Sequence, residues 1–197
     1  ALATMGFAGA LFHTLNHACF KALLFLGAGN VIQQTHSGNL EDFGGLIKRM
    51  PHTAWLFLVG SASIAALPPL NGFASEWLVF QSLLAGTRIP QMEGAVGFPL
   101  AVGALALTSG LAAVCFVKAF GTSFLAVPRS DRAAQARESH WSMLAPTSLL
   151  AVACIVLGLA APMVVEALNH VLTSVPGLAA REVLPSNRLA LTGLGGL

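Results

Sequence analysis

Residues 53–85 read TAWLFLVGSASIAALPPLNGFASEWLVFQSLLA, a long apolar run that is interrupted at Leu67–Gly72. The two prolines in the interruption remove two backbone donors and disfavour helix at the residue before them. Asn71 and Gly72 then suit a turn or a helix cap. The stretch therefore predicts two half-helices, at about 53–66 and 73–86, joined by a break.

The break falls in the middle of a run long enough to cross a bilayer, which takes about 20 apolar residues per helix. It would therefore lie near the bilayer midplane. Irregular backbone at that depth is tolerated only where protein or trapped water surrounds it. Such breaks commonly mark ion sites in transporters, so the region around Leu67–Gly72 is a candidate site.

The whole chain has the composition of a membrane protein. Its 197 residues are 55% hydrophobic and only 9% charged, with a mean hydropathy of +0.75. A soluble domain carries about 25% charged residues, and this chain has too little charge to make a polar surface. Three more apolar runs lie at residues 5–32, 98–127 and 141–172. We predict an all-α integral membrane protein with four transmembrane helices, the second of them discontinuous at Leu67–Gly72.

These runs divide the chain into a membrane domain at residues 1–172 and a tail at 173–197. The tail has no strong periodicity and is expected to be partly disordered. The chain opens at Ala1 inside an apolar run, without the charged segment or cleavage site of a signal peptide. The expectation from this opening is a fragment of a longer chain.

The loops indicate an orientation in the inner (plasma) membrane. The loops at 33–52 and 128–140 follow the first and third helices and lie on one side. The basic residues of that side are Lys48, Arg49, Arg129, Arg132 and Arg137, against Arg88, Arg181 and Arg188 on the other. Because cytoplasmic loops carry an excess of Lys and Arg, the loops at 33–52 and 128–140 are predicted to be cytoplasmic.

The sequence offers no site for a redox cofactor. Cys19, Cys115 and Cys154 are far apart in apolar runs, form no CxxC pair and are interpreted as small apolar side chains. There is no cysteine cluster for an iron–sulfur centre and no GxGxxG for flavin or NAD. A net charge of +2 without a dense basic stretch gives no argument for nucleic-acid binding. No cofactor is expected.

Titratable residues recur every four positions inside the first apolar run, at His13, His17 and Lys21. On a helix this spacing makes one stripe that drifts by about 40° per step and covers ~12 Å of depth. A lysine at the bilayer centre costs about 2.5–3.5 kcal/mol, which is expensive for a purely structural role. Desolvation disfavours the charged form of an amine, and imidazole can accept and donate a proton together.

The stripe is therefore interpreted as a water-bridged proton relay. One alternative is a hydrogen-bonded interface that only holds a neighbouring helix. A metal site is a second alternative, since histidines four residues apart can share an ion. It lacks a third ligand, and a protonated Lys21 would repel a cation. No metal is expected.

Two more ionisable residues lie inside apolar runs. Glu76 follows the break, where the exposed amides of a helix start favour negative charge while Phe73 and Trp77 favour the neutral form. The opposed effects would allow this carboxylate to bind and release a proton. The alternative is that Glu76 only caps the start of the helix. Lys118 could extend its ammonium to the interface or serve as a relay station between Lys21 and the surface.

Three motifs together resemble one family. They are FHTLNHACFKALLF at residues 12–25 followed by Gly27-Ala28-Gly29, LPPLNGF at 67–73 with Ser75-Glu76-Trp77, and FVKAFG at 116–121. This set resembles the antiporter-like subunits of respiratory complex I, Mrp antiporters and membrane-bound hydrogenases. It is most similar to the hydrogenase 4 component B (formate hydrogenlyase-type) branch. The resemblance covers residues 1–170 and leaves the tail out.

The resemblance implies a place within a larger fold. Family members have about fourteen transmembrane helices in two inverted repeats, each with one discontinuous helix. This chain is similar to the last four, helices 11–14. The lysine of the family's second half-channel falls on Lys21, its preceding histidines on His13 and His17, and its twelfth-helix ionisable residue on Glu76. Lys118 matches a lysine common in the hydrogenase-like branch. The first repeat, with its own Glu–Lys pair, has no counterpart here.

The expected function is a piece of a proton-translocating subunit in a hydrogenase-4-like or NADH–quinone oxidoreductase-like complex. Its partners would be other membrane and redox subunits, the lipid bilayer and protons. The redox chemistry would belong to the partners, so whether the subunit counts as an enzyme is open. An Mrp-type Na+/H+ antiporter subunit is one alternative. A non-conducting membrane scaffold is another, and it predicts a dry interior around Lys21.

Overall fold

A computed structural model describes residues 2–88 and 92–174, and within these ranges every regular element is helical. The tail expected at 173–197 lies outside the described residues beyond Ser174. The longer helices are α1 (Leu2–Thr35), α2 (Pro51–Ile64), α3 (Asn71–Gly86), α4 (Met92–Phe124), α6 (Trp141–Leu159) and α7 (Ala161–Thr173). Short helices in the connections are η1 (Leu40–Asp42), η2 (Leu46–Lys48) and α5 (Asp131–Gln135).

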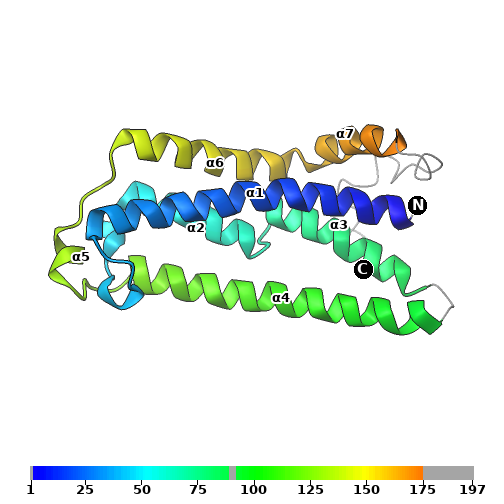
Figure 1. Ribbon diagram of the computed structural model, residues 1–197, viewed down its shortest axis with the longest axis horizontal. Helices are drawn as coiled ribbons and strands as arrows, with labels where there is room; N and C mark the ends of the chain where they lie inside the picture. The colour runs from blue at the N-terminus through cyan, green and yellow to red at the C-terminus, as the bar shows by residue number, and fades with distance from the viewer. Residues whose placement is uncertain (1, 89–91, 175–197) are drawn as a thin grey trace.

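The long helices lie side by side along one axis, with α1 in the middle (Figure 1). α1 packs against α2, α3, α6 and α7, whereas α4 packs against α2 and α3. α2 and α3 follow one another along a shared path, as α6 and α7 do on the other side of α1. The discontinuous helix therefore lies between α1 and α4.

Three helices are long and apolar enough to cross a bilayer, at Thr4–Thr35, Ala95–Phe124 and Trp141–Leu159. α2 and α3 have 14 and 16 residues, fewer than the ~20 that one crossing needs, so they cross together. Large apolar side chains cover the outside of the bundle, with Phe25 75% exposed and Leu149 71% exposed. The predicted all-helical membrane fold with a discontinuous second helix is confirmed.

The break spans the residues between Ile64 and Asn71 and is packed tightly by backbone. A Cβ added to Gly72 would lie 1.8 Å from the carbonyl oxygen of Ser63. One added to Gly158 of α6 would lie 2.3 Å from the carbonyl oxygen of Pro69. Glycine at these two positions allows the chain ends of the break to approach each other and α6. Protein thus encloses the irregular backbone on this side, as its depth in the membrane requires.

The run predicted as one helix at 141–172 is two helices, α6 and α7, that meet at Ala160. Pro162 lies in the first turn of α7. It has no N–H to donate to the Gly158 carbonyl, and its ring would clash with that oxygen in a continuous helix. The same turn of α6 is the part that packs against the break. The chain therefore changes direction between α6 and α7 at a point beside the break between α2 and α3.

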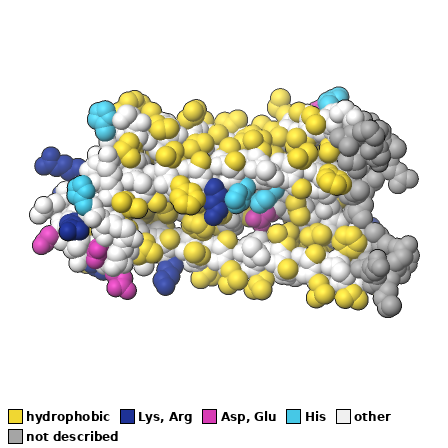
Figure 2. Space-filling view, viewed as in Figure 1, with side chains coloured by type: hydrophobic (Ala, Val, Ile, Leu, Met, Phe, Trp, Pro, Cys, Tyr) yellow, Lys and Arg dark blue, Asp and Glu magenta, His cyan; other side chains and the backbone are white. Residues whose placement is uncertain are grey.

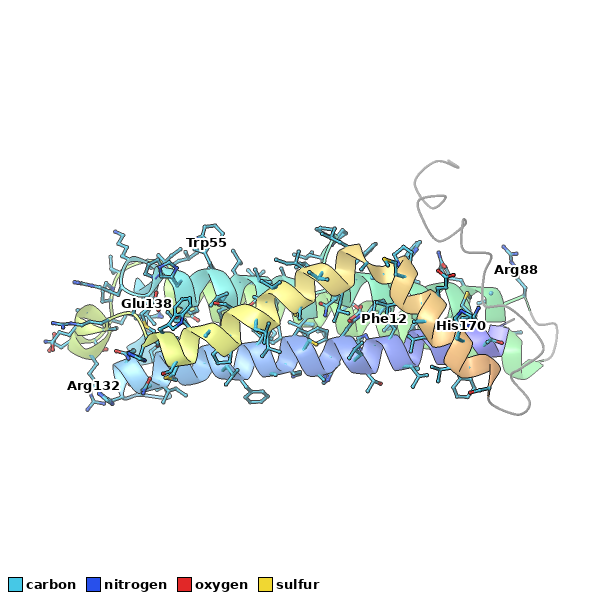
Figure 3. All side chains as sticks on the ribbon, turned by 90° about the horizontal axis from the view of Figure 1, so that it is seen from above. Phe12, Trp55, Arg88, Arg132, Glu138 and His170 are labelled. Atoms are coloured by element: carbon cyan, nitrogen blue, oxygen red, sulfur yellow. The ribbon has the colours of Figure 1, made fainter. Side chains whose placement is uncertain are left out.

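The loops predicted to share one side do lie at the same end of the bundle and are hydrogen-bonded together. The Gly45 N–H donates to the Leu125 carbonyl at 2.7 Å, and the Arg129 Nε–H donates to the Phe43 carbonyl at 2.8 Å. Arg132 and Glu138 mark this end in Figure 3, and Arg88 marks the opposite end. The connections after α1 and after α4 therefore form one structural unit.

Glu138, just before α6, caps α2 from another part of the chain. Its carboxylate accepts the His52 N–H at 2.7 Å and the Thr53 hydroxyl at 2.6 Å. α2 begins at Pro51, and its own N-cap residue, Met50, makes no side-chain cap. A carboxylate at a helix N-terminus satisfies free amides and interacts favourably with the helix dipole. Glu138 therefore links the start of α6 to the start of α2.

Replacing Glu138 by alanine is expected to lower the unfolding free energy by about 1–2 kcal/mol, the usual cost of losing an N-cap. Glu138→Gln keeps one acceptor oxygen and should recover part of the loss. The measurement is the thermal unfolding midpoint of the purified protein in detergent. Glu41→Ala is the matched control, because Glu41 is exposed at the same end. Equal midpoints for the Glu138 and Glu41 variants would contradict the capping role.

Candidate functional site

The histidine–lysine stripe lies midway along α1. Lys21 lies about 14 residues before the end of α1 at Thr35, which is about 21 Å along the axis. The rings of His13 and His17 are 6.0 Å apart between centroids, and the Phe20 ring packs 5.3 Å from His17. His13 and Lys21 are half-buried, and His17 is exposed. The stripe is thus far from either polar end of the bundle.

The same placement is visible on the surface. Figure 2 shows histidine side chains beside a lysine or arginine and an acidic side chain, midway along the molecule with hydrophobic side chains around them. In the chain, the stripe lies in the middle of α1, and Glu76 lies in the second turn of α3, just after the break. Charges at this depth are costly in a bilayer and rarely serve packing alone. The middle of the bundle is therefore the candidate functional site.

Two contacts connect the stripe to the break. His13 Nδ1 lies 3.1 Å from Ser75 Oγ, and that hydroxyl lies 3.2 Å from the carbonyl oxygens of both Asn71 and Gly72. Asn16 Nδ2 donates to the Asn71 carbonyl at 2.9 Å, and Asn71 Nδ2 donates to Asn16 Oδ1 at 3.3 Å. Both asparagines are fully buried. Since buried amides are costly without partners, this pair fixes the start of α3 against α1.

Glu76 occupies the second turn of α3, which packs against both α1 and α4. Its Oε2 accepts a hydrogen bond from Ser109 Oγ of α4 at 2.6 Å. The residue before it, Ser75, contacts the His13 imidazole of α1. The carboxylate is half-buried. The carboxylate beside the break thus bonds to α4, while its neighbour Ser75 bonds to α1.

The structure brings together four of the five residues singled out from the sequence. His13 bonds to Ser75, the residue before Glu76, and His17 and Lys21 continue along α1 from there. In the described part of the chain Lys21 forms no ion pair, so its coupling to Glu76 is not a direct salt bridge. Coupling would require bridging water or the intervening histidines.

Lys118 is not part of this group. It lies nine residues after Ser109 on α4, and nine residues turn a helix by about 900°, which is half a turn beyond two full ones. Lys118 therefore lies on the opposite side of α4 from Glu76, and its side chain is exposed. Its role as a relay station stays a prediction.

Three polar residues of the site were not singled out from the sequence. Asn16 and Ser75 lie within or beside the motifs at residues 12–25 and 67–77, but neither is titratable. Ser109 is a small polar residue in an apolar run, like its neighbour Thr108. The local sequence pattern does not indicate which of Ser109 and Thr108 belongs to the site. Only the packing of α4 against α3 shows that Ser109 contacts Glu76.

The three cysteines are free thiols. Cys19 is half-buried and Cys115 exposed, while Cys154 is buried in a cluster with Phe20 and Leu23. In residues 2–88 and 92–174, no group of three or more His, Cys, Asp or Glu side chains is arranged to hold a metal ion. The carboxylate of Glu76, the imidazoles of His13 and His17 and the amine of Lys21 are all groups that can exchange protons.

Comparison with known proteins relates this chain to subunits of membrane-bound complexes. Residues 1–92 match the family described as NADH:quinone oxidoreductase/Mrp antiporter, TM. The chain is 41% identical over 205 residues to hydrogenase-4 component B of Escherichia coli (strain K12), covering 96% of this chain and 30% of that protein. It is 41% identical over 173 residues to formate hydrogenlyase subunit 3 of the same organism, covering 86% of this chain and 28% of that protein.

A solved structure shows the same arrangement of helices. The membrane-bound sulfane sulfur reductase, an archaeal respiratory membrane complex, contains a chain that matches with a TM-score of 0.70 and 28% identity. The match covers 84% of this chain and 26% of that one. The chain thus spans less than a third of the length of each of these relatives.

Proposed function

This chain belongs to the NADH:quinone oxidoreductase/Mrp antiporter transmembrane family. We propose that it moves protons through part of a membrane. It would do so as a component of a hydrogenase-4-like or NADH–quinone oxidoreductase-like complex. The observation that carries the proposal is the position of Glu76. A titratable carboxylate lies at a helix discontinuity in mid-membrane, next to a stripe of two histidines and a lysine.

The proposed path runs from Lys21 through His17 and His13 to Glu76. Each step along α1 rises about 6 Å, which is too far for a direct hydrogen bond and suits one bridging water. Each imidazole can accept a proton at one nitrogen while it releases another. His13 Nδ1 already faces Ser75, so its other nitrogen is free to face the stripe. A charge change elsewhere in the complex would move the proton by altering the coupling between Lys21 and Glu76.

The contacts favour conduction over a purely structural role. If the stripe served only to hold neighbouring helices, its members would bond to them. Within the described chain His13 bonds to α3, while His17 is exposed and Lys21 has no ion pair. Because a lysine facing lipid costs about 2.5–3.5 kcal/mol, we expect further membrane protein to cover this face. That expectation supports partner subunits in the membrane.

The location that we propose is the inner membrane, with the loops at 33–52 and 128–140 in the cytoplasm. The excess of Lys and Arg in these loops supports this orientation. Electron transfer would take place in partner subunits. Two relatives, a hydrogenase component and a formate hydrogenlyase subunit, support partners of that class.

The test is Glu76→Gln, which keeps the shape and the acceptor oxygen but cannot titrate. In inverted membrane vesicles that carry the assembled complex, proton uptake should fall at least about tenfold, since a positioned proton-transfer group contributes at least that much. Glu166→Gln is the matched control, because Glu166 is an exposed carboxylate of α7. Proton uptake is followed with a pH-sensitive dye, and assembly by the amount of complex in the membrane.

Two results would reject the proposal. Normal proton uptake in the Glu76→Gln vesicles would show that this carboxylate carries no protons. Uptake that depends on sodium on the opposite side would assign the site to Na+/H+ exchange instead.

A further inference from the structure

The Ser109 hydroxyl has two acceptors within reach. Its Oγ lies 2.6 Å from Glu76 Oε2 and 3.0 Å from the Leu105 carbonyl oxygen of its own helix. A serine hydroxyl has a single proton to donate, so it can serve only one of these at full strength. The other hydroxyls of α4 that form bonds, those of Thr108 and Thr122, bond only to carbonyls of that helix. Ser109 therefore differs from them in its contact with α3.

The charge of Glu76 decides which acceptor receives the proton. An ionised carboxylate accepts the stronger, charge-assisted bond, and 2.6 Å is the length typical of that bond. A protonated carboxyl group carries its own proton and can donate it to Ser109 Oγ. The hydroxyl proton then turns to the Leu105 carbonyl. Both groups keep their hydrogen bonds in both states, and no proton leaves the pair.

We propose that Ser109 is a positioning residue that holds Glu76 against α4 in both protonation states, with the direction of their hydrogen bond reversed when the carboxyl group is protonated. The inference rests on the proposed function of Glu76 and adds a role for α4 in positioning that carboxylate. The titratable group that faces Glu76 from α1 is His13, with His17 one turn further. α4 presents no described charged side chain on this face, because Lys118 lies on its other side. Ser109 is thus the contact through which α4 controls the carboxylate.

The test compares Ser109→Ala with Thr108→Ala in membranes that carry the assembled complex. Thr108 is the matched control, since its exposed hydroxyl bonds only to the Ala104 carbonyl. Ser109→Ala should lower proton uptake about tenfold, which corresponds to one hydrogen bond to a charged group. Ser109→Thr keeps the hydroxyl and should restore uptake. Thr108→Ala should leave it unchanged.

An infrared difference spectrum supplies a readout that a merely structural role would not change. The C=O stretching band of protonated Glu76 is assigned by its absence in Glu76→Gln. It should shift to higher wavenumber in Ser109→Ala, because the carboxyl group loses its partner, and remain in place in Thr108→Ala. If Ser109→Ala fails to assemble, Ser109→Cys, which keeps the volume with a weaker donor, undergoes the same two measurements with the same expected direction.

The outcomes separate the two proposals. If Ser109→Ala matches Thr108→Ala in uptake and in band position while Glu76→Gln is inactive, the positioning role is wrong and the proposed function stands. If Glu76→Gln is fully active, the proposed function fails, and the role of Ser109 fails with it.

Discussion

Lys21→Ala is expected to abolish proton translocation while the complex still assembles. Lys21 is the amine at the end of the proposed path, and in the described chain it makes no ion pair whose loss would loosen the bundle. Removing it takes away the only amine of the stripe at mid-membrane. The expected loss of proton uptake is about a hundredfold or more, as for other groups that transfer protons directly. Uptake per assembled complex is measured in inverted vesicles.

Two further variants make this result specific. Lys48→Ala removes an exposed lysine at the end of η2 and should leave uptake unchanged. Lys21→Arg keeps the positive charge but holds its proton too tightly to exchange it near neutral pH, so it should remain inactive. If Lys21→Ala instead reduces assembly while uptake per assembled complex stays normal, the stripe is a helix interface and no relay.

Gly158→Ala should destabilise the fold at the contact between α6 and the break. The added Cβ would lie 2.3 Å from the Pro69 carbonyl oxygen and 2.7 Å from the Asn71 N. Because both atoms belong to backbone, no side chain can move aside to make room. Overpacking of this kind costs roughly 1–3 kcal/mol and displaces the surrounding backbone. The break carries Asn71, which positions the start of α3, so proton uptake should fall together with stability.

Gly110→Ala is the matched control for this substitution. Gly110 also lies inside a membrane-spanning helix, but in the described chain its added Cβ would have no other residue within 4 Å beyond its chain neighbours and its own helix backbone. Alanine there should be neutral or stabilise the helix by up to ~1 kcal/mol through its higher helix propensity. Thermal unfolding in detergent compares the two variants. A midpoint for Gly158→Ala equal to that of Gly110→Ala would show that the break does not depend on close contact with α6.

The sequence alone determined the features that depend on local chemistry. Proline chemistry predicted the break, and the structure has α2 end at Ile64 and α3 begin at Asn71. A four-residue spacing on a 3.6-residue helix predicted the stripe of His13, His17 and Lys21. Apolar run length predicted the spans. Each of these depends on a few neighbouring residues of one segment, so the sequence contains the necessary information.

The tertiary structure alone decided how these parts meet. It gave Glu76 its partner Ser109, paired Asn16 with Asn71, supplied the cap of α2 from Glu138, and placed Lys118 on the far side of α4. Helical periodicity fixes where a side chain lies on its own helix, but not which helix will face it. A hydroxyl such as that of Ser109 can bond to its own backbone or to a neighbour with similar ease. The choice depends on the relative rotation of two packed helices, which no local pattern specifies.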